Sequence, residues 1–94
     1  MRVNERIFIS NTVFEVEFIS SAFKHGQNKE DILYALENSI YDEILESGPN
    51  KVLSIGFSRS AKLIEVIFHV LSDEHIVVFH AMPCRKHYTK RMVI

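Results

Sequence analysis

The chain contains few residues that constrain its backbone. Among its 94 residues there is one cysteine, Cys84, so no disulfide can form within the chain, and this favours a reducing compartment. Two prolines and three glycines predict few sharp loops. No apolar run approaches the roughly 20 residues that a membrane-spanning helix needs, and the start of the chain lacks the basic-then-apolar order of a signal peptide. We therefore expect a cytoplasmic protein.

What the chain does contain is enough for one packed core. Apolar residues make up 47% of it and aromatic residues 11%, more than a disordered chain carries. A chain of this length has no room for a second core. The sequence therefore predicts a single domain over residues 1–94.

Charge is unevenly distributed along the chain, although the net charge is only −1. Residues 1–50 contain four basic and nine acidic residues, a net charge of −5. Residues 51–94 contain seven basic and three acidic residues, a net charge of +4. This asymmetry is typical of a protein whose basic part meets an anion and whose acidic part meets a cationic or neutral partner, although an inert dipolar surface has the same pattern.

The apolar periodicity changes along the chain from helical to strand-like. Residues 3–9 are weakly strand-like. Helical spacing of apolar residues is found over residues 12–24. It is found again in a segment that begins after the cap Asn28 and ends at residues 39–41. Residues 41–47, 51–58, 62–71 and 76–82 alternate as strands, with short turns between them. After Pro83 comes a basic tail that can form one helical turn.

These elements predict an α+β fold. Connections this short force neighbouring strands to be antiparallel. We expect two helices packed on one face of a four-stranded antiparallel sheet, with a possible extra strand at the N-terminus.

The turns also predict which residues face one another. If the turn at Asp73 and Glu74 pairs its flanking residues, Glu65 lies opposite Met82 and diagonal to His80 on one sheet face. If the turn at residues 59–60 does the same, Glu65 also lies opposite Ser54. The sequence therefore predicts a shallow polar site on one face of the sheet, and a one-residue shift in either hairpin would alter it.

Three segments carry a resemblance to a known family. They are "KHG" at residues 24–26, "GFSRSAKLIEV" at residues 56–66 and "VFHAMPCRKHY" at residues 78–88. In this order the chain resembles the BrnT-like branch of the RelE-type toxins over about residues 20 to 88. The resemblance implies a RelE-like fold and a ribonuclease that inhibits translation. It also implies a co-encoded antitoxin that binds the toxin and represses their shared operon.

The resemblance also implies roles for single residues. Arg59 matches the family's turn arginine, Arg85 and Lys86 match its basic positions after the last strand, and His25 matches its histidine before the second helix.

Cleavage of RNA by internal attack needs a base for the 2′-hydroxyl, a cation on the phosphate and an acid for the leaving oxygen. We expect a metal-independent endoribonuclease without a cofactor. Its candidate catalytic residues are Glu65, His80, Arg85 and Arg59, and its candidate RNA-binding residues are Lys86, Tyr88, Lys90 and Arg91.

Each of these residues also has a purely structural interpretation. Glu65 can be a hydrogen-bonded strand carboxylate, Arg59 a solvated turn residue, and His25 the cap of a helix C-terminus. A metal site at Glu65, His69 and His80 is disfavoured, because residues four apart on a strand are about 13 Å apart. Cys84 stands beside basic residues that would lower its pKa, but a cysteine nucleophile would also need an oriented base.

The acidic half predicts a protein partner, since its carboxylates would repel RNA. We expect a cationic segment of an antitoxin to contact it, with Glu30, Asp31 and Glu37 as candidate contacts. Two other functions stay open: a non-catalytic protein-binding module, and a degenerate toxin that retains only antitoxin binding.

Overall fold

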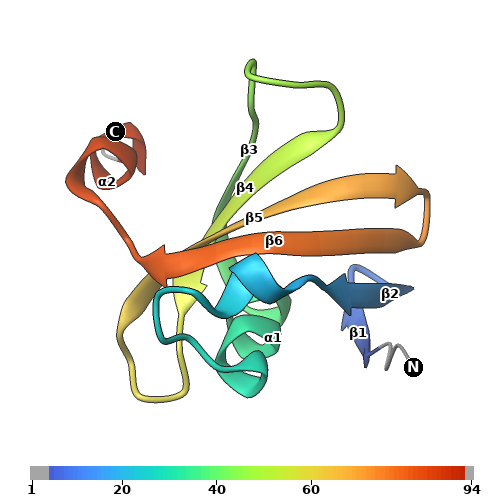
Figure 1. Cartoon of the computed structure of the whole chain (residues 1–94), viewed down its shortest axis with the longest axis horizontal. Coiled ribbons are helices and arrows are strands. Elements are labelled where there is room, and N and C mark those ends of the chain that lie inside the picture. Colours follow the sequence, from blue (N-terminus) through green and yellow to red (C-terminus); the bar gives the residue numbers. More distant parts are fainter. Residues whose placement is uncertain (1–4, 93–94) are drawn as a thin grey trace.

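The computed structural model describes residues 5–92. Its sheet has six strands in the order β1-β2-β6-β5-β4-β3. In chain order the elements are β1 (Glu5–Ile9), β2 (Thr12–Phe18), a short 3-10 helix η1 (Ser20–Phe23), α1 (Lys29–Glu37), β3 (Ser39–Ile44), β4 (Lys51–Phe57), β5 (Leu63–Ser72), β6 (His75–Pro83) and α2 (Lys86–Met92). Figure 1 shows the curled sheet with α1 against it and α2 set apart near the C-terminus.

The expected four-stranded antiparallel sheet is therefore wrong, although the fold is α+β. The four strands expected between residues 41 and 82 form as β3 to β6 and pair antiparallel in sequence order. The sheet gains β1 and β2, and β2 pairs parallel with β6, which makes it mixed. The two α-helices contact different core clusters on opposite faces of the sheet and do not share one face.

The segment expected to be a helix over residues 12–24 is instead β2 followed by η1. Ser10 and Asn11 both have positive φ angles, of 49° and 65°, between the paired residues Ile9 and Thr12. Two left-handed residues in a two-residue connection make a tight hairpin turn that matches strand twist. The weakly strand-like segment near the N-terminus thereby becomes β1, paired with β2; residues 3 and 4 of that segment lie outside the described residues.

The second expected helix is confirmed as α1. The Asn28 side-chain oxygen accepts a hydrogen bond from the Asp31 backbone N–H at 2.8 Å, which satisfies a free donor of the first turn. The helix buries Ile32, Ala35 and Leu36 against the sheet. Its last helical residue is Glu37, after which β3 begins at Ser39.

The register of β5 with β6 is as expected from Ile64 to Ile67, but that of β4 with β5 differs by one residue. Glu65 pairs with Met82, yet it pairs with Ile55 and not with Ser54. The loop causes this shift: the Ser58 N–H donates to the Lys62 carbonyl, so five residues, 58–62, separate the paired ends Phe57 and Leu63. The face that carries Glu65 is consequently more apolar than expected.

An irregularity in β6 also changes the faces. Ile67 pairs with His80, whereas the next residue, Phe68, pairs with Val78. Phe79 is therefore an extra residue in β6, as in a β-bulge. Val78 joins the buried cluster beneath α1, while Phe79 packs with the cluster on the opposite face.

Two clusters of side chains cover the two faces. The α1 face, defined by Ile64, Val66 and Val78, packs against α1 and the β1–β2 hairpin. The α2 face, defined by Leu53, Ile55 and Ile67, is packed by partly buried residues that include Tyr88 and Met92 of α2. The sheet therefore separates what lies under α1 from what lies near α2.

Candidate functional site

A fully buried carboxylate lies on the α2 face of the sheet. Glu65 of β5 has none of its surface exposed, and its chain neighbours Ile64 and Val66 are buried on the other face. An ionised carboxylate without partners in such a place would be very unfavourable. Its hydrogen-bond donors therefore determine what the site is.

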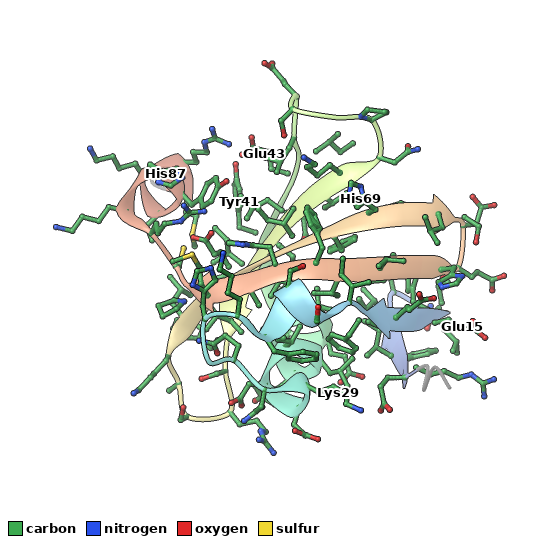
Figure 2. The ribbon with its side chains drawn as sticks, in the orientation of Figure 1. Glu15, Lys29, Tyr41, Glu43, His69 and His87 are labelled. Carbon is green, nitrogen blue, oxygen red and sulfur yellow. The ribbon has the colours of Figure 1, made fainter. Side chains whose placement is uncertain are left out.

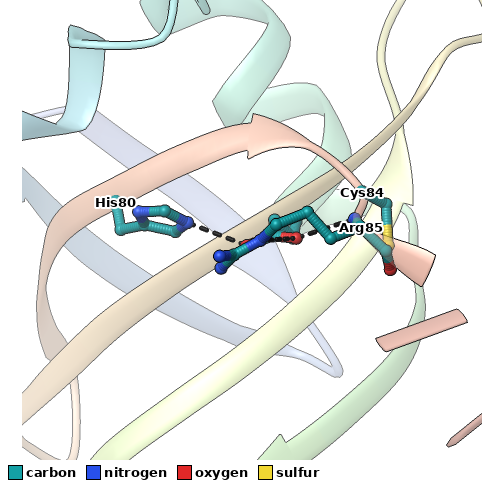
Figure 3. A network of polar contacts seen from close by, with 4 residues as sticks. His80, Cys84 and Arg85 are labelled. Carbon is teal, nitrogen blue, oxygen red and sulfur yellow. Dashed lines mark hydrogen bonds and ion pairs between the residues drawn. The ribbon is translucent and has the colours of Figure 1, made fainter. Parts of the chain in front are cut away.

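His80 and Arg85 supply the donors that surround the Glu65 carboxylate (Figure 3). The His80 Nε2 lies 2.8 Å from Glu65 Oε2. The Arg85 backbone N–H donates to Oε1 at 2.9 Å, its Nη2 donates to Oε2 at 2.6 Å, and its Nε lies 3.1–3.2 Å from both oxygens. Bonds of this kind, between ionised groups and in a fork, are the strongest that a protein makes.

These bonds keep Glu65 ionised. Burial raises the pKa of Glu65, but the hydrogen bonds from Arg85 and His80 outweigh it, and the pKa lies below its usual value. The same bonds raise the pKa of Arg85, against the opposing effect of burial. Both oxygens already accept bonds, so Glu65 is a positioning residue and not a free base. Because the carboxylate only accepts, His80 carries a proton on Nε2 and leaves Nδ1 for other chemistry.

A second imidazole lies beside the first. The ring centroids of His25 and His80 are 5.6 Å apart, with their planes at 70°. His25 lies in the exposed loop between η1 and α1. This loop reaches His80 because β2 stops pairing with β6 at Val78, after which the Ser21 hydroxyl donates to the Phe79 carbonyl at 2.6 Å and holds η1 against β6.

The expected closeness of Glu65 and His80 is confirmed, and Arg85 joins them. Arg59 does not: its Nε and backbone N–H both donate to Asp31 Oδ1, at 2.9 and 3.1 Å. The hydrogen bonds from Arg59 lower the pKa of Asp31. Arg59 thus fixes the β4–β5 loop to the first turn of α1, and the described contacts do not bring it to Glu65.

The four candidate RNA-binding residues all lie on α2. Tyr88 has the guanidinium carbon of Arg85 and that of Arg91 each 5.4 Å from its ring centroid. Arg91 also pairs with Glu43 of β3, whose other oxygen accepts from the Tyr41 hydroxyl at 2.7 Å. Figure 2 shows Tyr41 and Glu43 between β3 and α2. Arg91 and Tyr88 therefore attach α2 to the sheet, while Lys86 and Lys90 are exposed.

Cys84 and His69, two further candidates from the sequence, do not take part in the site. Burial and the charge of Glu65 raise the pKa of Cys84, although Arg85 opposes this, so the expected lowering is wrong. His69 stacks on Phe79, with ring centroids 4.5 Å apart, and does not join His80. Within residues 5–92 no group of three His, Cys, Asp or Glu side chains is placed to hold a metal ion.

Comparison with protein-family models, with curated proteins and with solved structures gives no match to this chain. Among the described residues, no helix is long and apolar enough to cross a membrane.

Proposed function

We propose that this protein is an endoribonuclease of the toxin type, which cleaves RNA to inhibit translation and is neutralised by an antitoxin protein. The observation that supports it best is the pair of imidazoles, His25 and His80, beside an arginine anchored on a buried carboxylate. The resemblance of three chain segments to BrnT-like toxins supports it from the sequence.

The pair has the components of RNA cleavage by internal attack. One imidazole in its neutral form takes the proton of a 2′-hydroxyl, whose oxygen then attacks the adjacent phosphorus. The other, protonated, gives its proton to the departing 5′-oxygen, which leaves a 2′,3′-cyclic phosphate and a 5′-hydroxyl end. The Arg85 side chain is 43% exposed and can place an N–H on the phosphate while Glu65 orients it.

The test uses the purified protein and a short fluorescent RNA. We expect slow cleavage to products with cyclic phosphate ends, with a bell-shaped dependence on pH because one imidazole must be neutral and the other protonated. Replacing either histidine, as His80→Ala or His25→Ala, should lower the rate by about 100-fold or more. Induced expression of the chain alone should arrest growth, and the same variants should relieve it.

The matched control is His69→Gln, which removes an imidazole from β5 without touching Glu65, His80 or Arg85. It should cleave as the parent does. If the two alanine variants are folded and cleave RNA as fast as His69→Gln, the network only attaches α2 to the sheet. The chain would then be a binding module or a toxin that has lost cleavage.

A further inference from the structure

The α1 face of the sheet is covered over only part of its length. Along β5, Ile64 and Val66 are buried beneath α1, but Phe68 and Val70, which point the same way, are only half-buried. Helix α1 has nine residues and ends before it reaches them. A cavity of about 590 Å³ lies there. Residues from all six strands and from the end of α1 line it, including Phe8, Leu36, Val52, Phe68, Val70 and Ile76.

The charges at this cavity all have one sign. Among the residues that the structure describes, its lining contains two carboxylates, Glu37 and Asp42, three serines and otherwise apolar residues, and no Lys, Arg or His. Glu37 accepts the Phe8 backbone N–H, at 3.5 Å, and Asp42 accepts the Ser39 hydroxyl at 2.9 Å.

Other carboxylates of the molecule differ in this respect. Asp31, Glu43 and Glu65 each pair with an arginine. Among the described residues neither Glu37 nor Asp42 has a cation within ion-pair distance. An apolar cavity that carries two uncompensated negative charges is complementary to an apolar group that carries a positive one.

We propose that this cavity is the docking site for a segment of a protein partner that presents apolar side chains together with Lys or Arg. The proposal rests on the part of the proposed function that gives the protein a partner, and it locates that partner. Three acidic residues were expected to contact the partner. Asp31 pairs with Arg59, and Glu30 does not line the cavity. Glu37 does line it, together with Asp42.

The surroundings favour an extended polypeptide as the occupant. Strands β1 and β3 are the two edges of the sheet, and both line the cavity. Each also exposes an apolar side chain, Phe8 at 58% and Ile40 at 51%. Free strand edges beside apolar pockets are what a polypeptide uses when it binds by strand addition. RNA is disfavoured, because its phosphates would meet the two carboxylates.

The test titrates labelled seven-residue peptides into the full chain and follows fluorescence anisotropy. The first probe alternates lysine and leucine, the second has serine in place of leucine, and the third has glutamate in place of lysine. We expect saturable binding of the first probe only, with amide chemical-shift changes around Phe8, Ser39 and Val70. Removing both charges, by Glu37→Gln with Asp42→Asn, should weaken it about tenfold or more. The matched control, Glu46→Gln with Asp73→Asn, removes two exposed carboxylates outside the cavity and should leave the affinity unchanged.

Absence of saturable binding of the first probe, equal binding of the second or third, or equal weakening by both double variants would each overturn the proposal. The two proposals fail separately, because the cavity and His80 lie on opposite faces of the sheet. The cavity variant should cleave RNA as the parent does, and His80→Ala should bind the peptide as the parent does.

Discussion

At the scale of single residues, the site depends on a glutamate that cannot act alone. Its partner His80 could be found from the sequence, because a two-residue turn between β5 and β6 sets which side chains share a face. Arg85 could be suspected only from its position in the chain. It follows Pro83, where the strand pattern ends, so no periodicity says that its guanidinium turns back onto Glu65. His25 was harder still, because no strand register relates a loop residue to His80.

Removing the charge of Glu65 should destabilise the protein. In Glu65→Gln the geometry is kept, but the ion pair with Arg85 is lost and an amide N–H faces donors. We expect the free energy of unfolding to fall by about 1–3 kcal/mol at neutral pH, as measured by urea unfolding. The exposed Glu46→Gln is the control and should change it by less than about 0.5 kcal/mol.

The cost of this substitution should depend on pH in a defined direction. The pKa of Glu65 is lowered in the folded protein, so its charge stabilises the fold above the ordinary carboxyl value of 4.5. That contribution is lost as the pH falls from 4.5 through the lowered pKa. The stability curves of the parent and Glu65→Gln should therefore converge in acid, and curves that stay parallel would contradict the assigned ionisation.

At the scale of elements, the difficult segment was β2. Its apolar residues Phe14, Val16 and Phe18 alternate with Glu15 and Glu17, which is a strand pattern. The apolar residues that follow them continue the segment at helical spacing, which favours a helix instead. The tight turn before β2 favours the strand over the helix. The turn lets β1 pair with β2, and this pairing satisfies the backbone groups that a helix would satisfy internally. The sequence contains no Asn-Gly pair at this turn, so the hairpin signal was weak.

The packing of α1 on β4 leads to a second prediction about stability. A Cβ added at Gly56 would lie 2.5 Å from the Ala35 carbonyl oxygen, which belongs to the helix backbone and cannot rotate away. Gly56→Ala should therefore push α1 from the sheet and lower the free energy of unfolding by about 1–3 kcal/mol, measured in urea.

Gly48→Ala serves as the control for this prediction. Its added Cβ would meet only the flexible end of Lys51, at 3.5 Å, which is ordinary contact. It should change stability by less than about 0.5 kcal/mol. If Gly56→Ala is equally harmless, α1 does not need its close approach to β4.

At the scale of the whole molecule, local patterns do not determine the strand order. The four-stranded part could be predicted because short turns fix its pairing. The parallel pairing of β2 with β6 joins residues about 60 positions apart, such as Val16 and Ile76, and no local signal announces it. The same pairing places the β1–β2 hairpin beside α1, on the face opposite to α2.

Charge is also redistributed when the chain folds. The sequence assigns seven basic residues to the second half, but Arg59 and Arg91 pair with Asp31 and Glu43 of the first half. Of the basic residues that follow β6, Arg91 pairs with Glu43, which leaves three exposed to a phosphate chain: Arg85, Lys86 and Lys90. Binding of RNA should therefore involve few cations, whatever the formal charge of the half suggests.

This count predicts how strongly RNA binding depends on salt. For single strands the logarithm of the binding constant falls with the logarithm of salt concentration by about 0.7 for each neutralised phosphate, so three contacts give a slope of about −2. A 2′-O-methyl RNA, which cannot be cleaved by internal attack, allows the slope to be measured at equilibrium. Lys86→Ala should make the slope shallower by about 0.7, whereas Lys62→Ala, in the β4–β5 loop, should leave it unchanged. A slope near −3.5, the value for about five contacts, would mean that Arg59 and Arg91 give up their carboxylates and turn to the RNA.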